Sequence, residues 1–169
     1  MVHPASLPID ALLADCRVDR TRGSGPGGQH RNKTETAIVI THLPTRVRGE
    51  ASERRSQGEN LAQAKFRLRL ELALAVRSVA AGGELGAPSE LWRGRVAGGR
   101  ISVSASHDDF PAIVAEALDT LAAVDWSAPA AAERLGVSTS QLVKLLNQEP
   151  RALGMLNREQ AARGLRPYL

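Results

Sequence analysis

Apolar and polar residues alternate in several short stretches of this 169-residue chain, which is the pattern of half-buried β-strands. The alternation is seen at residues 16–21 and again at residues 100–104. Residues 36–42 are rich in β-branched side chains and form the clearest strand, with residues 45–50 as its hairpin partner. A short helix is expected at residues 8–15, where a proline stands near the start. The pattern predicts a small, mostly antiparallel sheet.

One long helix is expected to pack on this sheet. From Ser56 to about Ala80, apolar residues recur every three or four positions, the spacing of one helical face. The members of this stripe are Leu61, Ala64, Leu68, Leu72, Ala75 and Val79. Residues 82–99 contain several glycines and read as a loop anchored by Trp92. The strand at residues 100–104 is then expected to close the sheet.

The last third of the chain has helical spacing throughout. Residues 109–123 form one predicted helix, with a proline in its first turn. Residues 130–146, "AAAERLGVSTSQLVKLL", resemble a helix-turn-helix, with Gly136 in the turn and Ser138 as the N-cap of the second helix. On that second helix, polar side chains are available to read bases. They are Thr139, Ser140, Gln141, Lys144, Asn147 and Gln148.

We therefore expect an α+β chain of two domains. Residues 1–105 hold the sheet and its long helix, and residues 106–169 form an all-helical extension with the helix-turn-helix-like pair at residues 128–149. The first part carries 16 Lys and Arg against 10 Asp and Glu, whereas the second carries 6 against 8. A basic first domain suits a polyanionic partner, although solvated arginines give the same count. Aromatic residues make up only 3% of the chain, which favours phosphate contacts over base stacking.

The composition points away from membranes, metals and disulfides. The longest apolar run, around residues 70–76, is short and is interrupted by Glu71. The first 13 residues lack the features of a secretion signal. Cys16 is the only cysteine, and the four histidines show no ligand spacing. We expect a cytoplasmic protein that is not bound to a membrane and has neither a metal site nor a cofactor.

A glycine-rich segment, "GSGPGGQHRNKT" at residues 23–34, is the most unusual part of the sequence. Glycines allow the main chain to approach another molecule closely, and Gln29 follows them with an accessible N–H and an uncharged carboxamide. No Gly-Lys-Ser/Thr follows, and a strand rather than a helix comes next, so nucleotide-binding loops do not fit. The residues alone leave two interpretations, a functional tip and a flexible surface loop.

The longer stretch "RGSGPGGQHRNKTETAIVITHLPT" resembles the Gly-Gly-Gln signature of the class-I peptide chain release factors and their short ribosome-rescue relatives. The resemblance continues through "ERRSQGENLAQAKFRLRL", where that family also has an Arg-Ser-Gln stretch at the start of its long helix. It extends more weakly to "GGRISVSASHDDFP". In all it covers about residues 7–125. It therefore identifies residues 1–105 as a Gly-Gly-Gln catalytic domain.

The resemblance implies peptidyl-tRNA hydrolysis in the large ribosomal subunit, where water attacks the ester between the nascent peptide and tRNA. Gly27, Gly28 and Gln29 coincide with the family motif and are the implied catalytic residues. In that family the Gln main-chain N–H contributes to the reaction, larger nucleophiles are excluded, and the Gln side chain is often N-methylated. The implied partners are ribosomal RNA, peptidyl-tRNA and an N-methylating enzyme acting on Gln29. The protein is expected to be a monomer.

Cationic and polar residues near the motif and on the long helix are expected to contact ribosomal RNA. The set is Arg22, His30, Arg31, Asn32, Lys33, Arg54, Arg55, Lys65 and Arg69. Arg54 and Arg55 stand at the start of the long helix, where phosphates bind readily, although a solvated helix start explains them equally well. Arg31 departs from the small apolar residue found at that position in many relatives.

We expect codon-independent hydrolysis, in termination or in the rescue of stalled ribosomes. The 169 residues leave no room for the stop-codon-reading domains of full-length release factors. The end, "AARGLRPYL", is shorter and less basic than the tails of the short rescue factors. The alternative is a nucleic-acid-binding regulator that uses the helix-turn-helix-like segment, with the Gly-Gly-Gln unit as a non-catalytic RNA-docking module.

Overall fold

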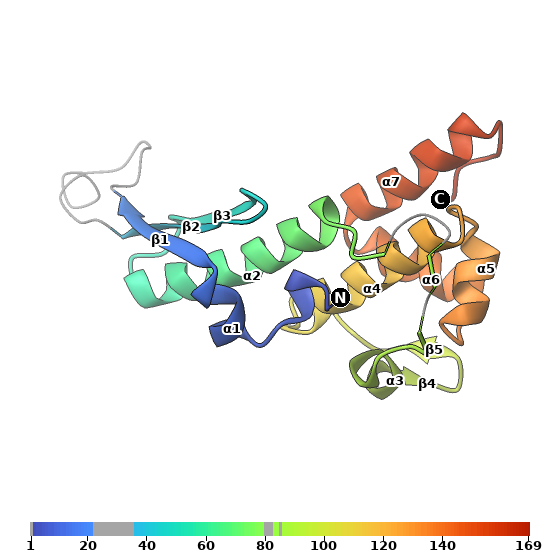
Figure 1. Ribbon diagram of the computed structural model, residues 1–169, viewed down its shortest axis with the longest axis horizontal. Helices are drawn as coiled ribbons and strands as arrows, with labels where there is room; N and C mark the ends of the chain where they lie inside the picture. Colours follow the sequence, from blue (N-terminus) through green and yellow to red (C-terminus); the bar gives the residue numbers. More distant parts are fainter. Residues whose placement is uncertain (1, 22–35, 80–82, 85) are drawn as a thin grey trace.

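The computed structural model describes residues 2–21, 36–79, 83–84 and 86–169. Figure 1 shows an elongated molecule with a three-stranded sheet at one end and a group of helices at the other, joined by the long helix α2. The predicted α+β class, with a small antiparallel sheet on one long helix and a helical C-terminal segment, is confirmed. Among the helices of these residues, none is long and apolar enough to cross a bilayer.

The sheet is antiparallel in the order β1-β2-β3. Strand β1 spans Cys16–Thr21, β2 spans Ala37–His42 and β3 spans Arg48–Ala51. The strands predicted at residues 16–21, 36–42 and 45–50 are confirmed, and β3 begins later than expected because the turn before it takes up more residues. In that turn Arg46 adopts a positive φ of 62°, and His42 and Thr45 are joined by a side-chain hydrogen bond of 2.7 Å.

Helix α2, Gln57–Ala75, covers one face of the sheet (Figure 1). It begins at Ser56, whose hydroxyl accepts the Glu59 N–H at 3.4 Å, and this is an N-cap interaction. The residues that it buries are Asn60, Ala64, Leu68, Leu72 and Ala73. Three members of the predicted stripe are therefore in the core, whereas Ala75 is exposed.

The predicted end of α2, near residue 80, is wrong, because the helix stops before Val76. Arg77 folds back and donates to the carbonyls of Ala73 and Leu74, which have no partner within the helix. The same guanidinium pairs with Asp119 at 3.3 Å. His3 donates from Nε2 to the Val76 carbonyl at 3.0 Å. These tertiary contacts end the helix, and its apolar periodicity alone does not reveal them.

Strand β3 approaches α2 closely at Gly49. A Cβ atom at this position would overlap the Leu68 N and the Ala64 O of the helix backbone, and it would lie 2.6 Å from Leu68 Cα. The absence of a side chain at Gly49 therefore allows the sheet to rest directly on the helix.

The segment predicted as a loop over residues 82–99 contains a helix, α3, at Glu90–Arg95 and a strand, β4, at Val96–Ala97. The expected strand at 100–104 shortens to β5, Arg100–Ile101, and it does not close the main sheet. Instead β5 pairs with β4 around a Gly98-Gly99 turn in which both glycines have positive φ. Such a two-residue turn favours a local hairpin over a distant partner.

Helix α4, Phe110–Ala123, is apolar on nearly every side and lies in the centre of the molecule, against α2. Three further helices follow it: α5 at Ala128–Arg134, α6 at Thr139–Asn147 and α7 at Pro150–Ala162. Two short helices precede the sheet, η1 at Pro4–Ser6 and α1 at Ile9–Ala14. One cluster of buried apolar side chains extends from Ile40 in β2 to Leu156 in α7. The division at residue 105 stays a prediction.

The helix-turn-helix-like pair has the predicted local structure. Gly136 has a φ of 68° in the turn between α5 and α6. The Ser138 hydroxyl caps α6 by accepting the Gln141 N–H at 3.3 Å. Trp92 is the anchor of the preceding segment, as expected, because it is 1% exposed and its indole N–H donates to the Leu135 carbonyl at 2.9 Å.

Candidate functional site

The Gly-Gly-Gln segment connects two neighbouring strands of the sheet, β1 and β2. Most of the expected site residues belong to residues 22–35 and lie outside the described residues. They are Arg22, Gly27, Gly28, Gln29, His30, Arg31, Asn32 and Lys33. The structure does describe both ends of this segment, because Thr21 ends β1 and pairs with Ala37 at the start of β2. The chain therefore leaves and re-enters the sheet at one point.

Asn60 fixes the point where the chain returns to the sheet. Its side chain is fully buried in the first turns of α2, and Nδ2 donates to the Thr36 carbonyl at 2.7 Å. The same nitrogen donates to the Arg54 carbonyl at 2.9 Å, while Oδ1 accepts the Arg54 N–H at 2.9 Å. One side chain thus joins the C-terminal end of the Gly-Gly-Gln segment, the start of α2 and the loop that carries Arg54 and Arg55.

Sequence reasoning missed Asn60. A detectable signal was present, since this amide lies four residues before Ala64 and therefore falls on the apolar face of the helix. A polar residue on a buried face needs internal hydrogen bonds, and such a residue is a candidate for positioning a neighbouring segment.

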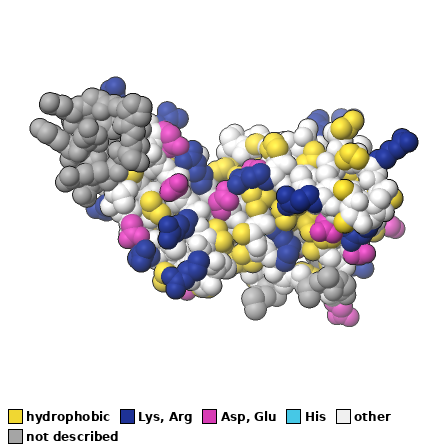
Figure 2. All heavy atoms as spheres, turned by 90° about the horizontal axis from the view of Figure 1, so that it is seen from above, with side chains coloured by type: hydrophobic (Ala, Val, Ile, Leu, Met, Phe, Trp, Pro, Cys, Tyr) yellow, Lys and Arg dark blue, Asp and Glu magenta, His cyan; other side chains and the backbone are white. Residues whose placement is uncertain are grey.

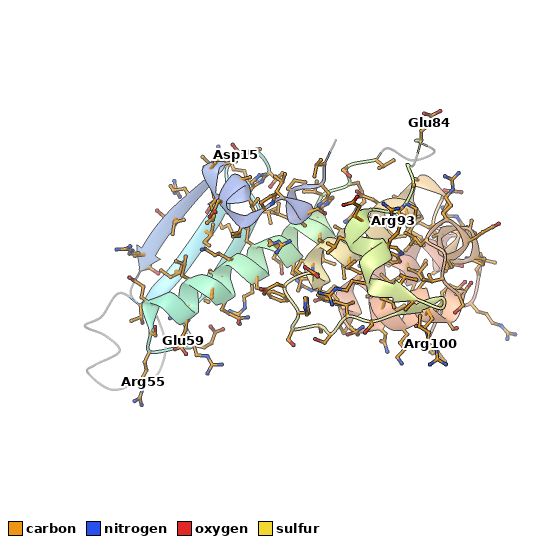
Figure 3. All side chains as sticks on the ribbon, turned by 90° about the horizontal axis from the view of Figure 1, so that it is seen from below. Asp15, Arg55, Glu59, Glu84, Arg93 and Arg100 are labelled. Carbon is orange, nitrogen blue, oxygen red and sulfur yellow. The ribbon has the colours of Figure 1, made fainter. Side chains whose placement is uncertain are left out.

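Arg54 and Arg55 lie near Thr36, the first described residue after the Gly-Gly-Gln segment, because Asn60 bonds both Thr36 and Arg54. Figure 3 shows Arg55 extending into solvent, with Glu59 of the first turn of α2 nearby. Both arginines are exposed, and neither guanidinium forms an ion pair with another described residue. Two charged groups are therefore available to phosphates beside the start of a helix.

The two other expected RNA contacts, Lys65 and Arg69, lie farther along α2. At a rise of about 1.5 Å per residue, they are roughly 12 and 18 Å beyond the helix start. Lys65 is half-buried. Arg69 turns inward, where it donates from Nε to the Ala5 carbonyl at 3.0 Å and from Nη1 to the Asp108 carbonyl at 3.1 Å. Burial lowers the pKa of Arg69, and this side chain joins η1 to the loop before α4.

Further cations that were not among the expected contacts line the sheet. Arg17 of β1 and Arg48 of β3 stand on either side of Thr41 in the strand register. Arg17 pairs with Asp19 at 2.8 Å, whereas Arg67 of α2 pairs with Glu53 at 2.6 Å. On the face seen in Figure 2, Lys and Arg side chains are dispersed among Asp and Glu and do not gather in one patch. Arg17 and Arg67 are therefore already paired with carboxylates, and they are less available to a polyanion than an unpaired cation would be.

Titratable groups in the described part of the chain do not gather into a metal site, because no three His, Cys, Asp or Glu residues there come together. Cys16 donates from its thiol to the Leu12 carbonyl at 3.2 Å, and burial raises the pKa of this thiol. His42 contacts Thr45 at the turn. The Cys16 thiol and the His42 ring are therefore engaged in hydrogen bonds within the fold.

Comparison with known proteins identifies the first half of the chain. The family model for the RF-1 domain matches residues 6–83. Peptide chain release factor 1 of Acidiphilium cryptum is 46% identical over 84 residues, which are 48% of this chain and 24% of that protein. The proteins of the same name from Nitrosomonas eutropha and Nitrosomonas europaea are each 59% identical over 51 residues, or 30% of this chain and 14% of theirs.

The match therefore spans no more than about a quarter of the length of these relatives. Within this chain, the domain match contains the whole β1-β2-β3 sheet, helices α1 and α2, and the segment with Gly27, Gly28 and Gln29. Residues 6–83 of this chain are therefore similar to the RF-1 domain, and the relatives that match this part of the chain are named peptide chain release factor 1.

Proposed function

We propose that this protein hydrolyses the ester bond of peptidyl-tRNA within the large ribosomal subunit, without reading a stop codon. The observation that carries the proposal is the RF-1 domain match over residues 6–83, which includes the Gly27-Gly28-Gln29 sequence. The relatives at 46% and 59% identity are named peptide chain release factors, and this name supports a role in ending peptide synthesis. The remaining steps follow from the chemistry of the motif.

In the proposed reaction a water oxygen attacks the carbonyl carbon of the peptidyl ester. The bond between this carbon and the tRNA oxygen breaks, one proton of the water passes to that oxygen and the other is released to solvent, so that the products are a peptide with a C-terminal carboxylate and a free tRNA. The negative charge that develops on the carbonyl oxygen needs a hydrogen-bond donor, and the main-chain N–H of Gln29 can supply it. Gly27 and Gly28 add no side chains that would keep the backbone away from the ester.

A loop that must reach a reacting group needs a rigid base, because small displacements of the donor lower the rate. Strands β1 and β2 and the Asn60 hydrogen bonds to Thr36 and Arg54 give this segment such a base. Arg54 and Arg55 are exposed beside it and are proposed to bind ribosomal RNA phosphates. Arg22, His30, Arg31, Asn32 and Lys33 are proposed to make further RNA contacts from the segment itself, and Lys65 from farther along α2.

The protein is proposed to work as a monomer in the cytoplasm, with the ribosome and peptidyl-tRNA as partners. An N-methylating enzyme that modifies the Gln29 carboxamide is a further proposed partner. Such a methyl group leaves the main-chain N–H free, so the modification is compatible with the donor role of that group.

The test is release of a labelled peptide from purified ribosomes stalled with peptidyl-tRNA, with either a stop codon or no codon in the decoding site. We expect release at similar rates from both complexes, and loss of release in Gly28→Ala. Release no faster than the spontaneous reaction from either complex would refute the hydrolase function. Release that requires the stop codon would leave hydrolysis intact and refute codon independence.

A further inference from the structure

A groove of about 520 Å³ lies between the β4–β5 hairpin and helix α6, at the opposite end of the molecule from the β1-β2-β3 sheet. Arg95, Ser102 and Ser104 line it from the hairpin side, and Lys144 and Gln148 line it from the helix. These side chains carry a guanidinium, two hydroxyls, an ammonium and a carboxamide. All five can donate hydrogen bonds to an anionic oxygen.

The walls of this groove are fixed to one another. The Ile101 N–H of β5 donates to the Gln141 carboxamide of α6 at 3.3 Å, and the Ser102 N–H donates to the Arg95 carbonyl at 2.8 Å. The indole N–H of Trp92 holds α3 against the end of α5 through the Leu135 carbonyl. The hairpin and the helix therefore present a preformed surface, and binding there costs little ordering of the chain.

The charge of the groove suits a polyanion. No carboxylate is among the described residues that line it. Asp109, outside the groove, forms an ion pair with Arg95 by accepting from Nε at 2.9 Å and from Nη2 at 2.5 Å, so the charge of this guanidinium is offset. Lys144 is exposed and forms no ion pair within the described part of the chain, so its full charge faces solvent. Arg100 of the hairpin is also exposed, beside Ile101 of the groove wall (Figure 3).

The surroundings of α6 disfavour its use as a DNA-reading helix. Lys144 also lines a second groove, of about 540 Å³, whose other wall includes the C-terminal residues Tyr168 and Leu169. The Tyr168 backbone is held by two hydrogen bonds to Asn157 of α7. The exposed strip of α6 thus lies between two walls, whereas a recognition helix must project into a major groove. Gln141, one of the side chains available to read bases, is half-buried against β5.

We propose that the groove between β4–β5 and α6 binds the phosphate backbone of RNA, as a second contact surface apart from the RF-1 domain. Because Arg95 is already paired with Asp109, the contact is expected with about one phosphate, mainly through the unpaired charge of Lys144. Arg95, the hydroxyls of Ser102 and Ser104 and the Gln148 amide complete it as hydrogen-bond donors. The choice of RNA over DNA rests on the proposed function, since ribosomal RNA is the polyanion that the protein would meet.

The test is a nuclear magnetic resonance titration of the full-length, isotope-labelled protein with an RNA stem–loop. We expect the backbone amide signals of Ser102, Ser104, Lys144 and Gln148 to shift in a saturable way. Fluorescence anisotropy over a salt series then measures the charge contribution of Lys144. In Lys144→Gln the slope of log affinity against log salt should decrease by roughly one unit or less.

The matched control is Arg158→Gln, which removes the same charge from an exposed position of α7 away from the groove. It should leave the groove shifts unchanged and lower the salt slope less than Lys144→Gln does. Unshifted groove amides would overturn the proposal, as would equal slopes for the two variants. The proposal would also be overturned if the groove responded only to purified ribosomal protein.

This titration requires no peptide release, so its outcome is separate from that of the hydrolase assay. Gly28→Ala should keep the groove shifts even where it abolishes release. Failure of the groove to bind RNA would leave the release assay unaffected.

Discussion

Asn60 on α2 and Thr36, the residue before β2, are joined by a hydrogen bond of 2.7 Å from the Asn60 carboxamide to the Thr36 carbonyl. The same carboxamide bonds both the N–H and the carbonyl of Arg54. In a buried position each of these groups would be left without a partner if the amide were removed. Asn60 is therefore a positioning residue for the segment that carries Gln29, and its role can be tested separately from the chemistry.

Asn60→Ala is expected to lower the free energy of unfolding by about 1–3 kcal/mol, because it leaves polar backbone groups unsatisfied. Peptide release should fall more than ribosome binding does, since the base of the catalytic segment is loosened. Urea unfolding and the release assay measure the two effects. Gln63→Ala, at an exposed position of the same helix, is the control and should change stability by no more than about 0.5 kcal/mol. Equal behaviour of the two variants would contradict the role of Asn60.

Gly49→Ala tests the close packing of β3 on α2. The added Cβ would overlap backbone atoms of Ala64 and Leu68, which cannot rotate away as a side chain can. We expect a loss of about 2–4 kcal/mol, since strand and helix must move apart. Gly154→Ala in α7 is a matched control with no atom within 4 Å of the new Cβ, and it should stabilise the helix by about 0.5–1 kcal/mol. A thermal melt that shows no loss in the Gly49 variant would exclude this packing.

Acid is expected to destabilise the fold through His3. Desolvation lowers the pKa of this histidine below its usual value near 6.5, with the Arg77 charge contributing and the Val76 carbonyl and Asp119 opposing. The unfolded chain therefore takes up the proton at a higher pH than the folded chain does. The free energy of unfolding should decrease as pH falls through 6.5 towards the folded pKa, by at most about 1.4 kcal/mol per pH unit for this one proton.

This contribution is measured by unfolding the protein in denaturant at several pH values between 8 and 5. His3→Asn retains a side-chain acceptor but cannot titrate, so its stability should fall less steeply over the same interval. Parallel curves for the two proteins would show that the protonation of His3 does not contribute.

The parts of the fold predicted correctly are those with a strong local signal. β2 is a run of β-branched residues, and α2 carries about two turns of apolar spacing through Ala64, Leu68 and Leu72. Helix α3 and strand β4 were missed because a six-residue helix and a two-residue strand are too short to show a period, whereas β5 was predicted but assigned to the wrong sheet. The structure of the α3–β4–β5 segment depends on long-range contacts such as that of Trp92 with Leu135, which the local sequence does not reveal.

The candidate site divides in a similar way. The motif residues around Gln29 were found from their composition and from the family resemblance, since both are properties of consecutive residues. Asn60 was missed because its partner Thr36 is 24 residues away in the sequence. Arg69 was expected at an RNA surface, but the structure directs its guanidinium to two internal carbonyls. Side-chain direction depends on tertiary packing, which charge counts do not contain.

Gly28→Ala tests the proposed catalytic motif. A methyl group next to Gln29 would displace its main-chain N–H, and a misplacement of about 1 Å can lower a rate on the order of 10²-fold. We expect peptide release to be nearly lost while ribosome binding stays within a few-fold. The measurement is single-turnover release beside a subunit-binding assay. Release at the normal rate would mean that the glycine is not needed for access to the ester.

Arg54 and Arg55 decide whether the end of the molecule near the start of α2 binds ribosomal RNA. Replacing both with Gln should weaken binding to purified large subunits, and each lost phosphate contact should lower the log–log salt slope by roughly one unit or less. Thermal stability should change little, because both guanidinium groups are exposed and have no ion pair within the described residues.

The control for this pair is Arg158→Gln with Arg166→Gln, which removes two exposed charges from the C-terminal part of the chain. Arg163 is unsuitable as a control, because it is paired with Asp125 at 2.7 Å and with Glu159 at 3.1 Å. The control pair should reduce subunit affinity less than the Arg54 and Arg55 pair does, since neither residue lies near the start of α2. An unchanged salt slope in the Arg54 and Arg55 variant would assign these two arginines to solvent, and the RNA contacts of the RF-1 domain would then have to come from other residues.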